Sequence, residues 1–318
     1  MEKIKFWFNN SRPYTIPITL LSWLVIFLFA LKHGGNAING ILAYFGIAIV
    51  HLVTNLADDY FDYKRLCADE RFLQSAKECK CKYLKEGNAS IDELRNVIII
   101  MLVIAGFLGA ILFFNTGIYV LLFALAGLFI ALSYSFMSSR GLGDIAVILA
   151  YGPLMYAGVY YVMTGDFSWD VILLSFASSM FVNSILYAHM LMDYDEDICS
   201  YKTTLCTKLG SKQKALNALM LFYAAGYMFM GILAAKTNGI LYCLTFLTFP
   251  LVINLCKSLQ IYNNDKTIVP TVKFYNYPLG DWNKIKNTPN ASFFLRFLFA
   301  RNISTWFMLL ACFAILFS

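Results

Sequence analysis

Two groups of acidic residues are the parts of this sequence best suited to chemistry. The first contains Asp58, Asp59 and Asp62, and the second contains Asp193 and Asp197. Residues three or four apart share one face of a helix, so each group can present its carboxylates together. Mg²⁺ takes one or two carboxylates together with phosphate oxygens and water. The two groups therefore predict Mg²⁺ sites that bind a phosphorylated substrate.

Both groups follow long apolar stretches and so lie at the ends of predicted membrane helices. A helix C-terminus disfavours negative charge, and carboxylates at membrane depth are costly and usually mark a functional site. A solvated acidic helix end is the plainer interpretation and is common for a single group. Two such groups on the same side of a membrane bundle indicate that a cation compensates them.

Positive charges accompany both groups, as expected around a metal–diphosphate pair, in which bases take the charge that the metal leaves over. The candidates are Arg12, Lys64, Arg65, Arg140 and Lys202. Each of them could instead serve only to orient the protein in the membrane.

Three further polar residues are candidates for the same site. Asn55 and His189 each precede an acidic group on the same predicted helix, and Tyr134 lies at the end of the fourth apolar stretch. Asn55 is either a hydrogen-bonding group of the metal site or a packing residue. His189 is either a base or a contact for a substrate, since its pKa suits proton transfer, or a hydrogen-bonded histidine between helices. Tyr134 faces either the reacting substrate or the membrane interface.

The composition is that of a membrane protein. Of the 318 residues, 59% are hydrophobic and 14% are charged, and the mean hydropathy is +0.64. An average soluble domain has about 25% charged residues. This excludes a large soluble core and favours an all-α integral membrane protein.

Nine stretches are long enough to span a bilayer, which takes about 20 apolar residues. They are 16–33, 38–57, 95–115, 117–137, 142–163, 167–191, 214–235, 238–258 and 301–318. We expect one nine-helix bundle forming a single domain over 1–318, with cytoplasmic loops at 63–94, 193–213 and 259–300.

The charges between these stretches predict the orientation. All 25 Lys and Arg residues except Lys32 and Lys236 fall on one side if the connections alternate. Positive residues favour the cytoplasm. We therefore predict that the N-terminus and both acidic groups are cytoplasmic and that the C-terminus is outside.

At these residues the chain resembles the UbiA-type intramembrane prenyltransferase superfamily, and most closely its 1,4-dihydroxy-2-naphthoate (menaquinone) branch. The stretch around the first acidic group, NLADDYFD from Asn55, is similar to the family's N-L-A-N-D-Y-x-D. The second group, followed by Lys202, Thr204-Leu205 and Leu209-Gly210, is similar to its D-x-x-x-D-x-x-x-x-K-x-T-L-x-x-x-L-G. Arg12-Pro13, Tyr134-Ser135, Gly141 to Asp144 and Gly152-Pro153 also match.

The resemblance implies Mg²⁺-dependent transfer of a prenyl group from a polyprenyl diphosphate to an aromatic, quinone-precursor-like acceptor. It implies metal binding by Asp58, Asp59, Asp62, Asp193 and Asp197. It implies direct roles in catalysis for Asp62, Asp193, Asp197, Lys202 and Tyr134. Substrate binding falls to Asn55, Arg12, Lys64, Arg65, Arg140 and His189. The bacterial cytoplasmic membrane is the expected location, with lipid as the surroundings and no nucleic acid as a partner.

Alternatives remain at this point. Asp58 stands where the family usually has Asn, and His189 and Met192 stand where the naphthoate branch often has Asn and Arg. A terpene cyclase or a transferase to a non-quinone acceptor would share the fold, and a cation-coupled transporter could also use membrane carboxylates. The spacing of Cys79 and Cys81 is not that of common zinc sites, so we expect free thiols. Chain length of the donor and oligomeric state are not indicated.

Overall fold

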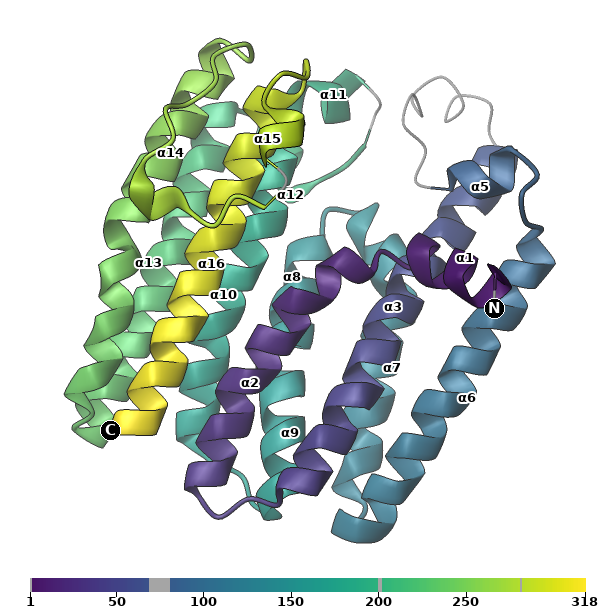
Figure 1. Cartoon of the computed structure of the whole chain (residues 1–318), viewed down its shortest axis with the longest axis vertical. Helices are drawn as coiled ribbons and strands as arrows, with labels where there is room; N and C mark the ends of the chain where they lie inside the picture. The colour runs from purple at the N-terminus through teal and green to yellow at the C-terminus, as the bar shows by residue number, and fades with distance from the viewer. Residues whose placement is uncertain (1, 69–80, 200–201, 281) are drawn as a thin grey trace. The chain divides into compact units, whose positions relative to one another are not determined.

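The computed structural model describes residues 2–68, 81–199, 202–280 and 282–318, which fold into helices joined by turns (Figure 1). Within this part of the chain, nine helices are long and apolar enough to cross a membrane. They are Pro13–Lys32, Ala37–Lys64, Ile91–Thr116, Tyr119–Ser138, Gly143–Thr164, Trp169–Met192, Lys212–Thr237, Ile240–Asn264 and Ala291–Phe317. The predicted all-α membrane fold with nine spans is confirmed.

The chain divides into two compact units. Unit 1 comprises Met1–Ala146 and Leu154–Phe167, and unit 2 comprises Val147–Pro153 and Ser168–Ser318. The fifth span contributes residues to both units. Each unit carries one of the two acidic groups.

Unit 1 is built around one long helix. Its elements are α1 (Glu2–Asn10), η1 (Pro13–Thr15), α2 (Ile16–Lys32), α3 (Ala37–Ala68), α5 (Lys82–Lys85), α6 (Ile91–Thr116), α7 (Tyr119–Ser138), the start of α8 (Gly143–Leu149) and α9 (Met155–Thr164). Helix α3 packs against α2, α6, α7 and α9. Its 32 residues make it about 48 Å long, which exceeds the roughly 30 Å hydrocarbon core of a bilayer.

The acidic residues of unit 1 therefore lie within a helix and not beyond its end. The predicted second span ended near residue 57, and the loop after it was predicted over about 63–94. In the structure α3 continues to Ala68 and α6 begins at Ile91. No glycine or proline interrupts residues 58–68, so the helix continues through them. Helix α6 begins early because Ser90 and Glu93 form a capping box, with bonds of 3.1 and 3.0 Å between each side chain and the other's backbone N–H.

Unit 2 is a bundle around α10 (Figure 1). Its elements are η2 (Ala150–Leu154), α10 (Trp169–Met192), α11 (Tyr194–Cys199), α12 (Leu205–Lys208), α13 (Lys212–Thr237), η3 (Ile240–Thr248), α14 (Phe249–Asn264), η4 (Phe274–Asn276), α15 (Trp282–Ile285) and α16 (Ala291–Phe317). Helices α13 and α16 pack directly on α10. The predicted loop over 193–213 contains the short helices α11 and α12.

The last span starts ten residues earlier than predicted, so the predicted loop over 259–300 was too long. Residues 291–300 are apolar except for Ser292 and Arg296, and Arg296 is fully buried. Its guanidinium donates to the carbonyl oxygens of Ser258, Ile268 and Ser292 at 2.8, 3.1 and 2.9 Å. These bonds make a buried arginine tolerable inside the bundle.

The surfaces of both units carry large exposed apolar side chains. On α6, Val103, Phe107 and Phe114 are between 66% and 83% exposed. A soluble protein rarely exposes such stretches. Such exposed apolar surface is expected of helices that cross a membrane.

Close packing in unit 2 depends on Gly226 of α13. A Cβ at this position would lie 2.7 Å from the ring of Phe181 and 3.2 Å from the carbonyl oxygen of Ala177, both on α10. Phe181 is fully buried and stacks on Phe307 of α16 with 3.7 Å between ring centroids. Small residues at such positions let membrane helices approach closely.

We predict that Gly226→Ala lowers the free energy of unfolding by about 1–3 kcal/mol, the usual effect of overpacking. Gly231→Ala on the same helix is the matched control, because its nearest neighbour would be Phe246 at 3.7 Å. Thermal unfolding in detergent measures both. Equal stability of the two variants would contradict the packing described here.

Candidate active site

The carboxylates of the acidic group in unit 1 differ in their burial and in their hydrogen-bond partners. Asp59 is fully buried, Asp58 is nearly so and Asp62 is half-buried. The two oxygens of Asp59 accept hydrogen bonds from the Arg12 guanidinium and from the Tyr83 hydroxyl, the latter at 3.2 Å. Asp62 instead accepts from the Ser135 hydroxyl of α7 at 3.5 Å. The three carboxylates thus do not share one set of partners.

Arg12 is held over the acidic turn of α3 by its own backbone turn. Its φ and ψ of 60° and 56° are left-handed, which is uncommon for a non-glycine residue and costs about 1–2 kcal/mol. The Thr15 hydroxyl donates to the Arg12 carbonyl at 2.8 Å, and Asn55 donates to the Ser11 carbonyl at 2.9 Å. Asn55 therefore links the backbone turn at Arg12 to α3. The sequence predicts a substrate-binding role for Asn55 and not this link.

Arg12 approaches both Asp59 and Asp58. Its Nη2 bonds Asp59 Oδ1, and its Nη1 lies 3.8 Å from Asp58 Oδ2. A single guanidinium thus compensates two adjacent carboxylates in a region with little water. The sequence-based prediction placed Arg12 near the substrate, and the structure places it in the acidic group.

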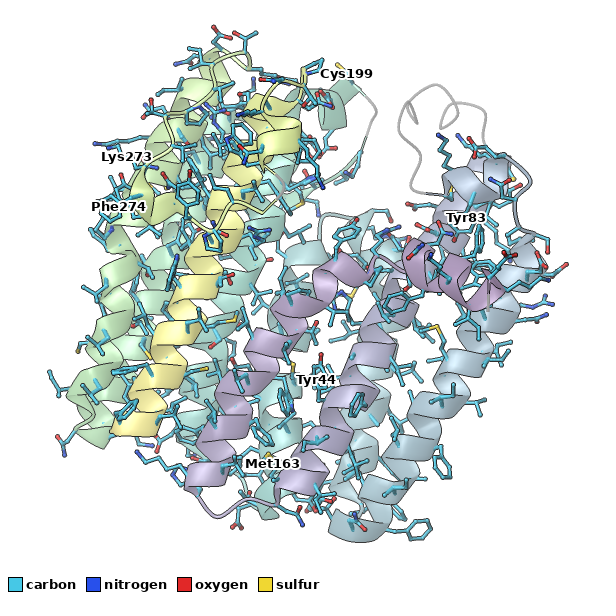
Figure 2. The ribbon with its side chains drawn as sticks, viewed as in Figure 1. Tyr44, Tyr83, Met163, Cys199, Lys273 and Phe274 are labelled. Atoms are coloured by element: carbon cyan, nitrogen blue, oxygen red, sulfur yellow. The ribbon has the colours of Figure 1, made fainter. Side chains whose placement is uncertain are left out.

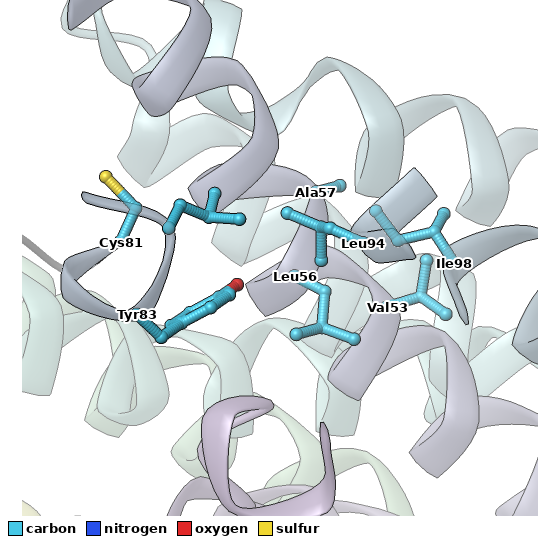
Figure 3. Packing of buried hydrophobic residues seen from close by; sticks show 8 residues of the cluster. Val53, Leu56, Ala57, Cys81, Tyr83, Leu94 and Ile98 are labelled. Atoms are coloured by element: carbon cyan, nitrogen blue, oxygen red, sulfur yellow. The ribbon is translucent and has the colours of Figure 1, made fainter. Parts of the chain in front are cut away.

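Tyr83 connects the acidic turn to the next segment of the chain. It lies beside α1 and α3 (Figure 2) and belongs to a buried cluster with Val53, Leu56, Leu94 and others (Figure 3). Burial, followed by the neighbouring Asp59 carboxylate, raises the pKa of the Tyr83 hydroxyl well above its usual value. Tyr83 therefore stays protonated and donates to Asp59. No sequence pattern indicated this residue, because its role depends on a contact with Asp59, 24 positions earlier in the chain.

The other predicted residues of unit 1 lie near the same end. The Lys64 ammonium lies over the Tyr60 ring at 4.7 Å, and the Arg140 guanidinium over the Phe136 ring at 3.4 Å. Tyr134 is half-buried at the end of α7, next to Ser135. The Arg65 side chain lies outside the part of the chain that the structure describes.

The acidic group of unit 2 forms a turn at the end of α10. The backbone N–H of Asp193 donates to the His189 carbonyl at 3.1 Å, and that of Asp197 to the Asp193 carbonyl at 2.8 Å. His189 Nδ1 lies 3.1 Å from Asp193 Oδ2, and Lys202 Nζ lies 3.1 Å from Asp197 Oδ1. The predicted group of Asp193, Asp197, His189 and Lys202 is thus assembled in one place.

His189 also contacts two aromatic residues of α16. Its ring meets Phe293 and Phe297 edge-on, with centroids 5.1 and 6.0 Å away. The His189 side chain is 44% exposed. This combines an apolar surface with a group that can take up a proton.

Two neighbouring carboxylates of this turn differ in their electrostatics. Burial would raise the pKa of Asp195, but hydrogen bonds and charge from Lys212 at 2.7 Å and Lys266 at 3.4 Å hold that pKa below its usual value. Burial raises the pKa of Asp197 despite Lys202, and the charge of Asp193 adds to the rise. At Asp197, burial therefore outweighs the favourable charge of Lys202.

The donor set in each unit suits a hard divalent cation. It consists of carboxylate oxygens beside cationic side chains, which is the chemistry that Mg²⁺ and phosphate groups require. Among the described residues, no three His, Cys, Asp or Glu side chains are already gathered as a metal site. Within the part of the chain that the structure describes, no disulfide links the cysteines at 67, 81, 199, 206, 243, 256 and 312, and Cys79 lies outside that part.

A model of the UbiA prenyltransferase family matches residues 16–276. The chain belongs to the UbiA prenyltransferase family. The resemblance seen in the acidic motifs is thereby confirmed, and so is the prediction of a prenyltransferase. The transporter alternative no longer stands.

Several relatives refine this family membership. The 1,4-dihydroxy-2-naphthoate octaprenyltransferase of Haemophilus influenzae is 28% identical over 239 residues, covering 70% of this chain and 76% of the relative. A structure of digeranylgeranylglyceryl phosphate synthase has a TM-score of 0.63 at 15% identity and covers 98% of this chain and 99% of its own. A UbiA homologue from Archaeoglobus fulgidus bound to GPP and Mg²⁺ has a TM-score of 0.58 at 14% identity, covering 96% and 99%. At these identities the two structures show the shared fold alone.

We predict opposite effects for the neighbouring carboxylates of this UbiA-family chain. Since the folded-state pKa of Asp197 is raised, its charge opposes folding at neutral pH, and Asp197→Asn should leave thermal stability unchanged or higher. Asp195→Asn should cost up to about 1 kcal/mol, because it removes partly exposed ion pairs. Thermal unfolding at pH 7 without metal tests both, and a larger loss for Asp197→Asn would contradict the assignment.

Proposed function

We propose that this chain transfers a prenyl group from a polyprenyl diphosphate to 1,4-dihydroxy-2-naphthoate or a closely similar aromatic acceptor, in a Mg²⁺-dependent reaction. The observation that carries the proposal is the turn at the end of α10. There the buried carboxylate of Asp197 is paired with Lys202, and burial still raises its pKa. A divalent cation would stabilise the charged form of Asp197, and a diphosphate would offer oxygens to Lys202.

One Mg²⁺ would be held by Asp58 and Asp62 in unit 1, and a second by Asp193 and Asp197 in unit 2. Bound Mg²⁺ would neutralise the charge that develops on the diphosphate as its bond to the allylic carbon breaks. Lys202, 3.1 Å from Asp197, is placed to contact phosphate oxygens beside the same carboxylate. Lys64, Arg65 and Arg140 are proposed to add positive charge around the donor, as their positions beside the first motif suggest.

The allylic carbon, once its bonding electron pair has left with the diphosphate, is attacked by an electron-rich carbon of the acceptor ring. That ring carbon then releases its own substituent, a proton or the carboxylate as carbon dioxide, which restores the aromatic ring. Tyr134 is proposed to face the developing positive charge, since an aromatic ring face attracts cations. His189 is proposed to contact the acceptor. Its support is the combination of Asp193 on one side and Phe293 and Phe297 on the other.

The naphthoate acceptor is supported by the relative from Haemophilus influenzae. The departures at Asp58 and His189 lie in the same motifs, so other aromatic acceptors belong in the test. A transferase with a non-quinone acceptor or a terpene cyclase would be recognised by its product.

We further propose that the protein lies in a bacterial cytoplasmic membrane with both motifs on the cytoplasmic side. The charge distribution supports this, because Lys32 and Lys236 are the exceptions to a one-sided placement of Lys and Arg. The diphosphate donor is then delivered from the cytoplasm, and the prenyl chain extends into lipid.

We predict that the purified protein, given Mg²⁺, geranylgeranyl or longer diphosphates and 1,4-dihydroxy-2-naphthoate, forms a prenylated lipid-soluble product. Asp62→Asn and Asp193→Asn should each lower kcat by about 100-fold or more, as expected when a preorganised electrostatic group is removed. Radiolabelled donor and extraction of the product measure this.

Asp195→Asn is the matched control, because Asp195 pairs with Lys212 and Lys266 and is not assigned to the metal. It should retain turnover within a few fold. Mg²⁺-independent turnover, or turnover of Asp62→Asn near the wild type, would contradict the proposal. Conversion of the donor without any acceptor would indicate a cyclase.

A cysteine introduced at Asn238, between α13 and η3, should react with an impermeant maleimide from outside the cell. Cys199 in α11 is exposed and should react only after the membrane is opened. Each site is measured in a background without the other cysteines. Reversed reactivity would place the acidic motifs outside.

A further inference from the structure

Asp59 is set apart from Asp58 and Asp62 by its burial and its partners. Its carboxylate has no measurable exposure, and each of its two oxygens already accepts a hydrogen bond from a side chain, Oδ1 from Arg12 and Oδ2 from Tyr83. Each oxygen keeps a second lone pair, so burial is what separates Asp59 from a metal: a ligand must be accessible to the cation and to the substrate, and this carboxylate is not. The guanidinium of Arg12 supplies positive charge to Asp59 from within the protein.

Tyr83 is buried, as is the carboxylate to which it donates. Its ring meets those of Phe6 and Trp7 of α1 edge-on, with centroids 5.9 and 5.7 Å away. It is 6% exposed and packs in the cluster formed by α3, α5 and α6 (Figure 3). Three elements, α1, α5 and the turn at Arg12, thus converge on one carboxylate of α3.

We infer that Asp59 is a structural anchor and not a Mg²⁺ ligand, and that Tyr83 is a positioning residue that fixes the acidic turn of α3 through it. The inference rests on the proposed function for the metal-binding role of Asp58 and Asp62. Because Asp58 and Asp62 lie within one turn of Asp59 on the same helix, rotation or fraying of this turn would move both carboxylates. The anchor prevents that motion without touching the substrate.

The first test measures Mn²⁺ binding by electron paramagnetic resonance, with geranyl diphosphate and without acceptor. Asp62→Asn should lose a bound ion. Tyr83→Phe keeps the ring packing and removes only the hydroxyl, so it should keep the number of ions and weaken their affinity by about three- to tenfold. Tyr60→Phe, in the same turn of α3, is the matched control and should bind as the wild type does.

Asp59→Asn should also keep the number of bound ions, unlike Asp62→Asn. If Asp59→Asn does not fold because Arg12 is left buried and uncompensated, the double variant Arg12→Gln with Asp59→Asn replaces it. Loss of one ion by a folded Asp59 variant would show that Asp59 is a ligand and overturn the inference.

The second test is independent of metal and of catalysis. Cys81 is buried two residues before Tyr83, in a chain whose other cysteines are replaced for this measurement. Tyr83→Phe should increase the rate of maleimide labelling at Cys81 by about tenfold, because α5 is released from α3 more often. Tyr60→Phe and Asp62→Asn should label at the wild-type rate.

The two readouts separate the inference from the proposed function. If the wild type binds no Mn²⁺ and transfers no prenyl group, the proposed function is wrong, and the metal part of the inference is wrong with it. Labelling of Cys81 then still decides whether Tyr83 and Asp59 hold the turn. An unchanged labelling rate in Tyr83→Phe would overturn the anchor itself.

Discussion

The need to compensate carboxylates at the ends of membrane helices governs both functional parts of this molecule. Burial disfavours charge at Asp58, Asp59 and Asp197, and the helix dipole adds to this at the end of α10. In unit 1 the compensation comes from Arg12, which lies over Asp58 and Asp59. In unit 2 it comes from Lys202 beside Asp197, and His189 Nδ1 lies beside Asp193.

The partners of each carboxylate separate structural from functional residues within one motif. Asp59 has a donor for each oxygen, and Asp195 has two lysines, so each is compensated by the protein alone. Asp197 is buried, and burial raises its pKa although Lys202 lies 3.1 Å away. Residues left in that condition are the ones that a bound cation would stabilise.

The same constraint shapes the bundle away from the motifs. Arg296 is fully buried in α16 and is tolerated because it binds carbonyl oxygens from three segments. These bonds hold the connection after α14 against the bundle. Gly226 meets the complementary requirement of close helix packing, which replaces the hydrophobic effect as the source of stability in lipid.

The membrane class, the number of spans, the two acidic motifs and the enzyme family followed from the sequence by itself, because hydropathy and short motifs are local properties of the chain. The helix ends did not: α3 runs through its motif and α16 starts at Ala291, since packing and the contacts of Arg296 extend them. Motif spacing alone made Asp58, Asp59 and Asp62 equivalent. Only the tertiary structure distinguished them, because the partners of Asp59, Arg12 and Tyr83, come from distant parts of the chain.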